Sequence, residues 1–587
     1  MNINRKFTRV FVALSLLASV FTTSIVECQA QKNPNVIISN HAQTAQGYVQ
    51  GLVQSTKYGK VQGLQEGQTL IWKGISYAKA PVGELRWKAP QDPEVWDGIF
   101  DATKNAKVAT QSKFPAPGTM GSDDCLNLDI YRPDTNQKNL PVLVYVHGGN
   151  NQTGTSTELM PNKLAVNANC VVVSINYRLD LLGFNNLPAL KTGNPLEDSG
   201  NYALLDMAKS LDWIKQNAVA FGGNPENITV SGFSAGGRDV MAMLISPIFK
   251  DKFQKAISFS GGMTVADSAD STKVIAKAIA KLVVQDKVKE TEVAAYEWLL
   301  QNTPEVKAYL YNLPTERLVN LIGNADIRMS AFPHLYADGV VVPKEGFATP
   351  KYNNVPLIML TGSTEFSFFA MYSPYFVAAQ QQKTLLSDPK MHNEVSFAIK
   401  YGSKLYGLFN AEESATKMFG KYKAPIYTCD IDWGTDETVV GKEMAELIGS
   451  HHGIFLPFLT DENTQIRKMF PEAFNNQGVQ DLTVKFQKYI SNFLWSGNPN
   501  SDGLVKWEAW KNANKGPSQF VFNADKDKAI VKMSYERVSY TDVLKEMEGD
   551  QTITLEAKDK IIKEVLNGRW FSSQLDQHFG NSSLWIQ

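Results

Sequence analysis

Residues 227–245, "NITVSGFSAGGRDVMAMLI", begin as a short apolar run typical of a buried strand and continue, after one serine between two glycines, as a stretch suited to a helix. A strand that turns directly into a helix holds the intervening Ser234 in a strained conformation and projects its hydroxyl out of the sheet. Side chains at Gly232 and Gly236 would collide where strand and helix nearly touch. Ser234 is therefore a candidate nucleophile, although the pattern GxSxG is weak evidence by itself.

Apolar strand-like runs alternate with helical patterns on both sides of this segment. "PVLVYVHGG" (141–149) and "NCVVVSINYR" (169–178) resemble buried strands, and "NYALLDMAKSLDWIKQN" (201–217) has helical apolar spacing. This alternation predicts an α/β fold with a mostly parallel central sheet flanked by helices.

No long linker divides the sequence, so we expect one catalytic domain over residues 31–587. Within it, residues from about 265 to 325 read as amphipathic helices with no strand between them. Such a helical insertion could cap an active site, but plain packing at the periphery fits the pattern equally well.

The first thirty residues have the layout of a secretory signal peptide. Arg5, Lys6 and Arg9 precede an apolar run of about a dozen residues, which is shorter than the roughly 20 needed to span a bilayer. We therefore predict cleavage after Ala30, a secreted or periplasmic protein, and no transmembrane segment in the mature chain.

The rest of the composition excludes several classes of protein. The net charge of −1 gives no sign of a nucleic-acid partner, which normally requires a basic surface. Cleavage after Ala30 leaves Cys125, Cys170 and Cys429, an odd number without CxxC spacing, so neither a full disulfide framework nor a structural zinc site is expected.

A glycine-rich segment, "HGGNN" (147–151), directly follows the predicted strand at 141–146. Together with the start of the helix after Ser234, it could supply the backbone N–H groups that stabilise an oxyanion. We predict that Gly149, Asn150 and Ala235 donate them, since glycine permits close approach of the main chain to a substrate. Taken alone, the segment would read as an ordinary glycine turn.

These motifs together identify a family resemblance. "FGGNPENITVSGFSAG" (221–236) and "DDCLNLDIYRP" (123–133) resemble the two signatures of the type B carboxylesterase and cholinesterase family of α/β-hydrolases. The likeness extends over nearly the whole mature chain, through "INYRLDLLGF" (175–184) and "SNFLWSGNPNSDG" (491–503). It implies an α/β-hydrolase fold and a catalytic triad in the chain order serine, carboxylate, histidine.

The resemblance also places the other two members of the triad. In "GSHHGIFLPF" (449–458) the family's His-Gly pair falls on His452 as general acid and base, with His451 as its competitor. In "LTGSTEFSFF" (360–369) the catalytic carboxylate falls on Glu365, which would orient the histidine. The implied reaction is a two-step acyl transfer through an acyl-enzyme.

Several positions depart from the family. Phe233 replaces a glutamate, and Pro115 stands where cholinesterases carry the tryptophan that stacks on quaternary ammonium groups, so neutral esters fit better than choline esters. Asn150 replaces the third glycine of the oxyanion loop, and Ala109 replaces the cysteine that usually pairs with the one at Cys125. We expect the substrate pocket to be lined by Phe233, Phe368 and Phe369.

The sequence thus predicts a serine carboxylic-ester hydrolase that needs no cofactor or metal and takes small to medium neutral esters as its small-molecule substrates. Two alternatives remain open. One is a lipase-like esterase for longer acyl chains, with the helical insertion as a lid. The other is a non-catalytic, cholinesterase-like adhesion or binding protein. The oligomeric state is left open.

Overall fold

The computed structural model describes residues 37–39, 45–113, 116–323, 325, 331–460, 464–567 and 572–581. The predicted signal peptide (1–30) and Pro115 lie outside the described residues. The described residues form two compact units, the first within 37–256 and 264–353 and the second within 257–263 and 354–581. One catalytic domain over 31–587 stays a prediction.

The first unit contains the strands that were expected around the GxSxG motif. Their spatial order is β4 (Leu64–Glu66), β5 (Thr69–Ser76), β10 (Asn127–Pro133), β12 (Val171–Ile175), β11 (Leu140–Val146) and β13 (Gly223–Phe233). The inner pairs β12–β11 and β11–β13 are parallel, while the outer pairs are antiparallel. In this register Val144 lies between Val173 and Val230.

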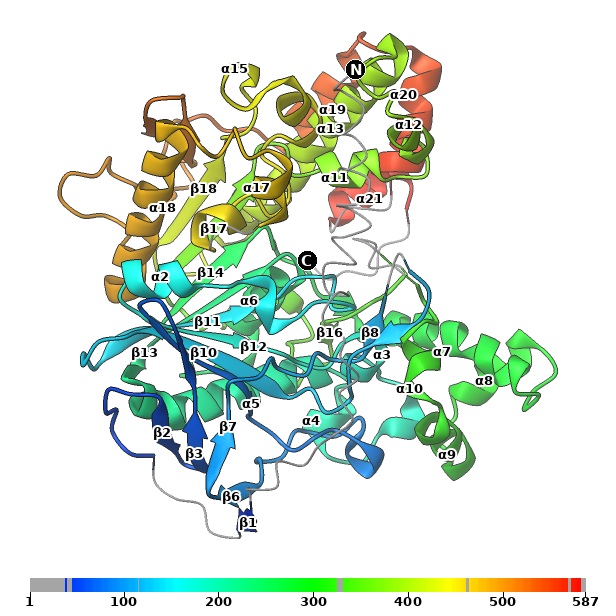
Figure 1. Cartoon of the computed structure of the whole chain (residues 1–587). Helices are drawn as coiled ribbons and strands as arrows, with labels where there is room; N and C mark the ends of the chain where they lie inside the picture. Colours follow the sequence, from blue (N-terminus) through cyan, green and yellow to red (C-terminus); the bar gives the residue numbers. More distant parts are fainter. Residues whose placement is uncertain are drawn as a thin grey trace. The chain divides into compact units, whose positions relative to one another are not determined.

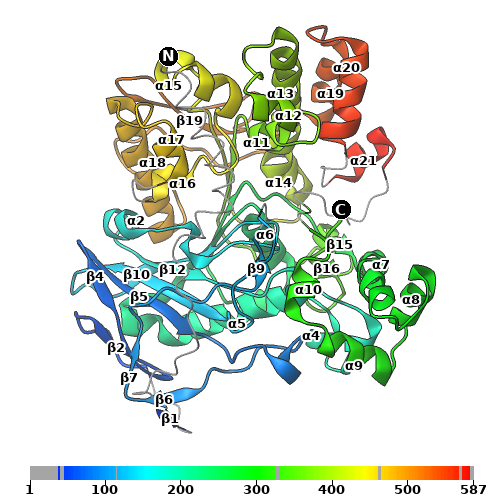
Figure 2. The same ribbon diagram turned by 45° about the vertical axis from the view of Figure 1, so that its right-hand side comes forward.

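Helices cover both faces of these strands, which explains why β11 and β12 are buried throughout and apolar at every position except Ser174. Figures 1 and 2 show α5 (Tyr202–Asn217) on one face and α2 (Asn162–Asn167) with α6 (Ala235–Ile245) on the other. Smaller elements of this unit are β1 (Ile37–Ser39), β2 (Val53–Thr56), β3 (Gly59–Gln62), β6 (Val95–Asp97), β7 (Ile99–Asp101), β8 (Gln111–Ser112), β9 (Thr119–Met120), α3 (Asp180–Gly183) and α4 (Pro195–Asp198).

The predicted helical insertion contains four helices. They are α7 (Ser268–Gln285), α8 (Glu292–Leu299), α9 (Pro304–Asn312) and α10 (Thr315–Val319), drawn in green in Figure 1. Asp267, Thr291 and Thr303 each accept a backbone N–H at the start of α7, α8 and α9, respectively, as N-cap residues do. Before and after them, β15 (Ala266–Asp267) pairs in parallel with β16 (Tyr336–Ala337). A lid function for this segment stays a prediction.

The second unit has its own run of neighbouring strands, in the order β14 (Lys255–Phe259, of which 257–259 belong to this unit), β17 (Leu357–Gly362), β18 (Ile426–Ile431), β19 (Phe520–Ala524) and β20 (Ala529–Met533). Strands β17, β18 and β19 are parallel, and β20 closes the edge as an antiparallel hairpin. The long helices α13 (Pro389–Asn410) and α18 (Gln477–Ser496) lie on opposite sides of these strands (Figures 1 and 2).

The remaining helices of the second unit are short. They are α11 (Ser367–Met371), α12 (Val377–Gln382), α14 (Glu412–Met418), α15 (Glu437–Val440), α16 (Leu456–Leu459), α17 (Gln465–Met469), α19 (Tyr540–Gly549), α20 (Leu555–Ile561) and α21 (Ser573–Phe579).

Cys125, Cys170 and Cys429 are buried and unpaired. Burial raises the pKa of the Cys170 thiol to about 12 and raises that of the other two thiols as well. None of the described helices is long and apolar enough to cross a membrane.

Candidate active site

Ser234 occupies the sharp turn between β13 and α6. Its backbone has φ +55° and ψ −114°, a strained conformation for a residue with a side chain. A Cβ at position 232 would lie 2.2 Å from the carbonyl oxygen of Gly236, and a Cβ at position 236 would lie 2.2 Å from that of Val146. Both glycines are therefore required by close backbone approach, as the sequence indicated.

The loop at 147–151 lies directly against this turn. A Cβ at Gly148 would meet the side chain of Phe233 at 3.1 Å and the Cβ of Ser234 at 3.3 Å. The next glycine, Gly149, has φ +95°, and a Cβ there would lie 2.2 Å from the carbonyl oxygen of Thr153. The two segments that the sequence singled out separately are thus neighbours within the first unit.

Three backbone N–H groups at this point have no acceptor among the described residues. They belong to Gly149, Asn150 and Ala235. The N–H of Ala235 has no intrahelical acceptor because it is the first residue of α6, and a helix N-terminus favours negative charge. Donors of this kind are suited to stabilising an oxyanion beside the Ser234 hydroxyl.

The side chain of Asn150 is bonded to neighbouring side chains and is therefore not an oxyanion donor. Its Oδ1 accepts a hydrogen bond of 2.8 Å from Nη2 of Arg238, and its Nδ2 lies 3.4 Å from Oε1 of Gln152. Replacing the usual glycine by asparagine therefore keeps the backbone N–H and adds a tether to α6. Neither Arg238 nor this tether was predicted, because no motif marks the pairing.

In the second unit, Glu365 and His452 form a direct pair. Nδ1 of His452 lies 3.0 Å from Oε1 of Glu365, which is fully buried after β17. The same Oε1 accepts a bond of 3.2 Å from Nδ2 of Asn410 on α13, and Oε2 lies 3.4 Å from the backbone N of Gly362. A buried carboxylate held in this way can orient an imidazole and stabilise its protonated form.

The two loops that carry this pair are tied together by their backbones. The N–H of Thr364 donates to the carbonyl oxygen of Ser450 at 3.1 Å, and a Cβ at Gly362 would lie 2.2 Å from that same oxygen. Gly449, just before Ser450, has φ +56° and approaches Thr364 closely. Glycine at 362 and 449 thus allows the loop after β17 to reach the histidine loop.

His451 has different surroundings from its neighbour. Its ring is buried, and burial lowers its pKa to about 4, so it is neutral at physiological pH. Nδ1 lies 3.3 Å from the carbonyl oxygen of Gly449, and the ring meets Phe368 edge-on at 5.0 Å. No carboxylate contact of His451 is found among the described residues.

The three phenylalanines predicted to line the substrate pocket lie near candidate catalytic groups. Phe233 contacts the glycine loop in the first unit. In the second unit, the ring of Phe369 lies 5.2 Å from that of His452, whereas Phe368 packs on His451. Their role in binding a substrate stays a prediction.

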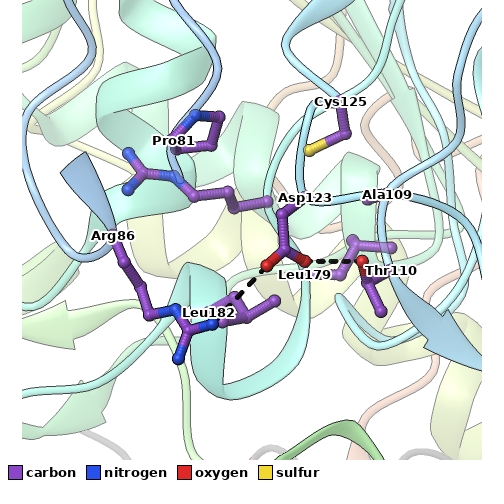
Figure 3. A pocket seen from close by; sticks show the side chains of 9 residues that line it. Pro81, Arg86, Ala109, Thr110, Asp123, Cys125, Leu179 and Leu182 are labelled. Carbon is purple, nitrogen blue, oxygen red and sulfur yellow. Dashed lines mark hydrogen bonds and ion pairs between the residues drawn. The ribbon is translucent and has the colours of Figure 1, made fainter. Parts of the chain in front are cut away.

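A second polar cluster in the first unit lies beside a cavity of about 10 Å³, lined in part by Cys125, Ala109 and Arg86. Figure 3 shows the carboxylate of Asp123 between Thr110, which donates a bond of 2.6 Å, and Arg86, at 3.7 Å. The cavity is barely the size of one water molecule, so it is not a substrate site. No group of three metal-ligating side chains occurs in the described part of the chain.

Comparison with known proteins gives consistent matches. A model described as the carboxylesterase family matches residues 39–422. A para-nitrobenzyl esterase of Bacillus subtilis (strain 168) is 28% identical over 483 residues, covering 78% of this chain and 92% of that protein. A liver carboxylesterase of Sus scrofa is 30% identical over 524 residues, covering 79% of this chain and 86% of that protein. The solved structure of a thermophilic pNB esterase has a TM-score of 0.59 at 28% identity, covering 82% of this chain and 97% of the esterase chain.

Proposed function

Because this chain belongs to the carboxylesterase family and is a carboxylesterase-type serine hydrolase, we propose that Ser234, Glu365 and His452 form its catalytic triad. The predicted α/β-hydrolase fold is confirmed by the likeness to esterase structures. The observation that carries the proposal is the strained Ser234 turn beside three backbone N–H groups that have no acceptor within the described part of the chain.

In the proposed reaction, Oγ of Ser234 attacks the ester carbonyl carbon while His452 takes the hydroxyl proton. The carbonyl oxygen becomes an oxyanion and accepts hydrogen bonds from the N–H groups of Gly149, Asn150 and Ala235. His452 passes the proton to the departing alcohol, leaving an acyl-enzyme. Water, deprotonated by His452, then attacks the acyl carbon, and the carboxylic acid leaves as Ser234 regains its proton.

The histidine in this scheme is chosen by its partner. His452 has a buried carboxylate 3.0 Å from Nδ1, which supports the tautomer that carries its proton on Nδ1 and a basic lone pair on Nε2. His451 lacks such a partner among the described residues, and its low pKa makes it a poor base.

We further propose that the substrates are neutral esters of small to medium size. Phe233, directly before the nucleophile, brings an apolar ring to a place where a carboxylate would attract a cation. The Bacillus subtilis relative is named for a para-nitrobenzyl ester and the Sus scrofa relative for carboxylic esters in general, and this supports the same substrate class for this chain.

The test compares the protein with Ser234→Ala on p-nitrophenyl acetate, butyrate and longer esters. We expect hydrolysis of the short esters by the unchanged protein and a loss of roughly 10⁴-fold or more in kcat/KM for the variant, because the covalent step is removed. Activity that survives the substitution would contradict the proposed mechanism.

The same panel separates the alternatives. Choline esters are expected to react no faster than neutral esters of the same acyl group, because Phe233 offers no carboxylate and Pro115 no aromatic ring to attract a cation. A strong preference for long acyl chains at an interface would instead favour the lipase-like alternative. A correctly folded protein without any esterase activity would favour the binding protein.

A further inference from the structure

The loop that follows β11 has an unusual backbone. Gly149, Asn150 and Asn151 have φ angles of +95°, +55° and +56°, so three consecutive residues are in the left-handed region. Asparagine tolerates this region better than most residues, but two in succession still require support from their surroundings. Something in the fold must hold this loop in place.

Two consecutive residues of α6 provide that support. Nη2 of Arg238 donates to Oδ1 of Asn150 at 2.8 Å, and Nδ2 of Asn151 donates to Oδ1 of Asp239 at 2.9 Å. Arg238, Asp239 and Asn151 are each at most 1% exposed, so these bonds are shielded from water. The backbone carbonyl of Asn151 also accepts a bond of 2.7 Å from the N–H of Asp180.

The helix that makes these contacts is the one that begins just after the nucleophile. The N–H of Ala235 lies at its first residue, and Arg238 and Asp239 lie one turn further on. The bonds to Asn150 and Asn151 therefore fix the loop N–H groups relative to both Ser234 and Ala235. Such placement matters because a shift of about 1 Å at a reacting centre can cost about 100-fold in rate.

The opposite charges of Arg238 and Asp239 also help to hold the loop 149–151 in place. Burial raises the pKa of Asp239 to about 7, while the bond from Asn151 and the positive charge of Arg238 act in the opposite direction. Arg238 thus helps to keep Asp239 ionised, and an ionised carboxylate is the stronger acceptor for the Asn151 amide.

We propose that Arg238 and Asp239 are positioning residues, which hold the loop 149–151 against α6 so that its backbone N–H groups face the developing oxyanion. This inference rests on the proposed function. Arg238 acts through the loop and does not contact the substrate. Asparagine is accommodated at position 150 because its side chain accepts the hydrogen bond from Arg238 that holds the loop.

The test is Arg238→Met, assayed on p-nitrophenyl acetate together with inhibition by a small trifluoromethyl ketone, which forms a tetrahedral adduct with a serine nucleophile. We expect kcat to fall about 10- to 100-fold with KM changed less than about twofold, because the support acts on the transition state. The inhibition constant of the ketone should rise by a similar factor. An unchanged kcat and inhibition constant would overturn the proposal.

Three further variants keep the proposal falsifiable. Arg132→Met removes an equally buried arginine of the same unit that bonds to backbone carbonyls elsewhere, and it should leave kcat per folded molecule unchanged. A comparable loss of kcat in Arg132→Met would overturn the inference. Arg238→Lys keeps the charge and a hydrogen-bond donor, so it should recover part of the kcat that is lost in Arg238→Met. A folded Arg238→Lys protein with no recovery of kcat would contradict the proposal.

The last variant is Asn150→Gly combined with Arg238→Met. Glycine adopts φ +55° without support, so Arg238→Met should lower kcat less than about threefold in the Asn150→Gly background. If the fold-losses of kcat from Asn150→Gly and Arg238→Met simply multiplied in the double variant, the two residues would act independently, and the proposed tether would be contradicted. Ser234→Ala serves as the reference: if it remains active, the proposed function fails, whereas if it is inactive and Arg238→Met is normal, only the present inference fails.

Discussion

Adjacent residues His451 and His452 differ in the one contact that decides whether a histidine can act as a general base. His452 has Glu365 at Nδ1, whereas the buried ring of His451 meets Phe368 and a backbone carbonyl. We predict that His452→Ala lowers kcat/KM for p-nitrophenyl acetate by roughly 10⁴-fold, because proton transfer is lost. His451→Ala should lower it by less than about tenfold, with the main cost in thermal stability.

Steady-state kinetics and a melting curve on both variants check this prediction. The reverse pattern, an inactive His451→Ala and an active His452→Ala, would move the base by one residue. A parallel loss in both would mean that the loop as a whole, rather than one imidazole, sustains the activity.

At the residue scale, local backbone requirements could be predicted and distant partners could not. The need for Gly232 and Gly236 follows from a strand that meets a helix, and the close approach at both positions confirms it. The bond from Arg238 to Asn150 joins residues 88 positions apart, and Asn410 lies 45 positions from Glu365. Neither partner belongs to a motif, so only the folded chain reveals them.

At the scale of elements, the junction between α9 and α10 is fastened to the N-terminal part of the first unit. Arg86 donates to the carbonyl oxygen of Leu313 at 2.7 Å and to Oγ1 of Thr315 at 2.9 Å. Thr315 in turn donates to Asp123 at 2.6 Å, and Asp123 also accepts from Thr110. The helical insertion is therefore held by a network of partly buried polar groups.

We predict that Asp123→Asn loosens this junction, since the carboxylate accepts from two hydroxyls and lies beside a guanidinium. The cost should be about 1–3 kcal/mol in the free energy of unfolding, and amide hydrogen exchange should become faster in residues 304–319. Asp124→Asn is the matched control, because Asp124 pairs with Lys107 at the surface, where such pairs contribute little. Equal effects of the two substitutions would argue against the network.

The elements themselves were largely predictable where the pattern is local. The apolar runs at 141–149, 169–178 and 227–234 became β11, β12 and β13, and the helical spacing at 201–217 became α5. The neighbours of each strand could not be read from the sequence in the same way. The pairing of β18 with β19, for example, brings Cys429 opposite Phe520 across almost a hundred residues.

At the scale of the whole molecule, buried histidines link stability to pH. His334 is fully buried, and burial together with the charge of Arg238 lowers its pKa to about 3. An unfolded chain would protonate this histidine near pH 6.5, so the unfolded state binds one more proton between about pH 3 and 6.5. The contribution of His334 to stability is thus complete above pH 6.5 and is lost as the pH falls.

We predict that His334→Gln flattens this dependence. Between pH 6 and 4 the free energy of unfolding of the variant should fall less steeply than that of the unchanged protein, by up to about 1.4 kcal/mol per pH unit. Urea unfolding at several pH values measures the two slopes. Asp180 and Asp239, whose pKa values burial raises to about 7, act in the opposite direction but are common to both proteins. Identical slopes would contradict the prediction.

The three buried thiols have a practical consequence for following the whole chain. Cys125, Cys170 and Cys429 are distributed over both units, and each is shielded from solvent and held in its unreactive protonated form. An alkylating reagent therefore reaches each of these three cysteines only after the structure around it has opened. Mass spectrometry of the alkylated cysteines would then show which of the two units opens first, since Cys125 and Cys170 lie in the first unit and Cys429 in the second.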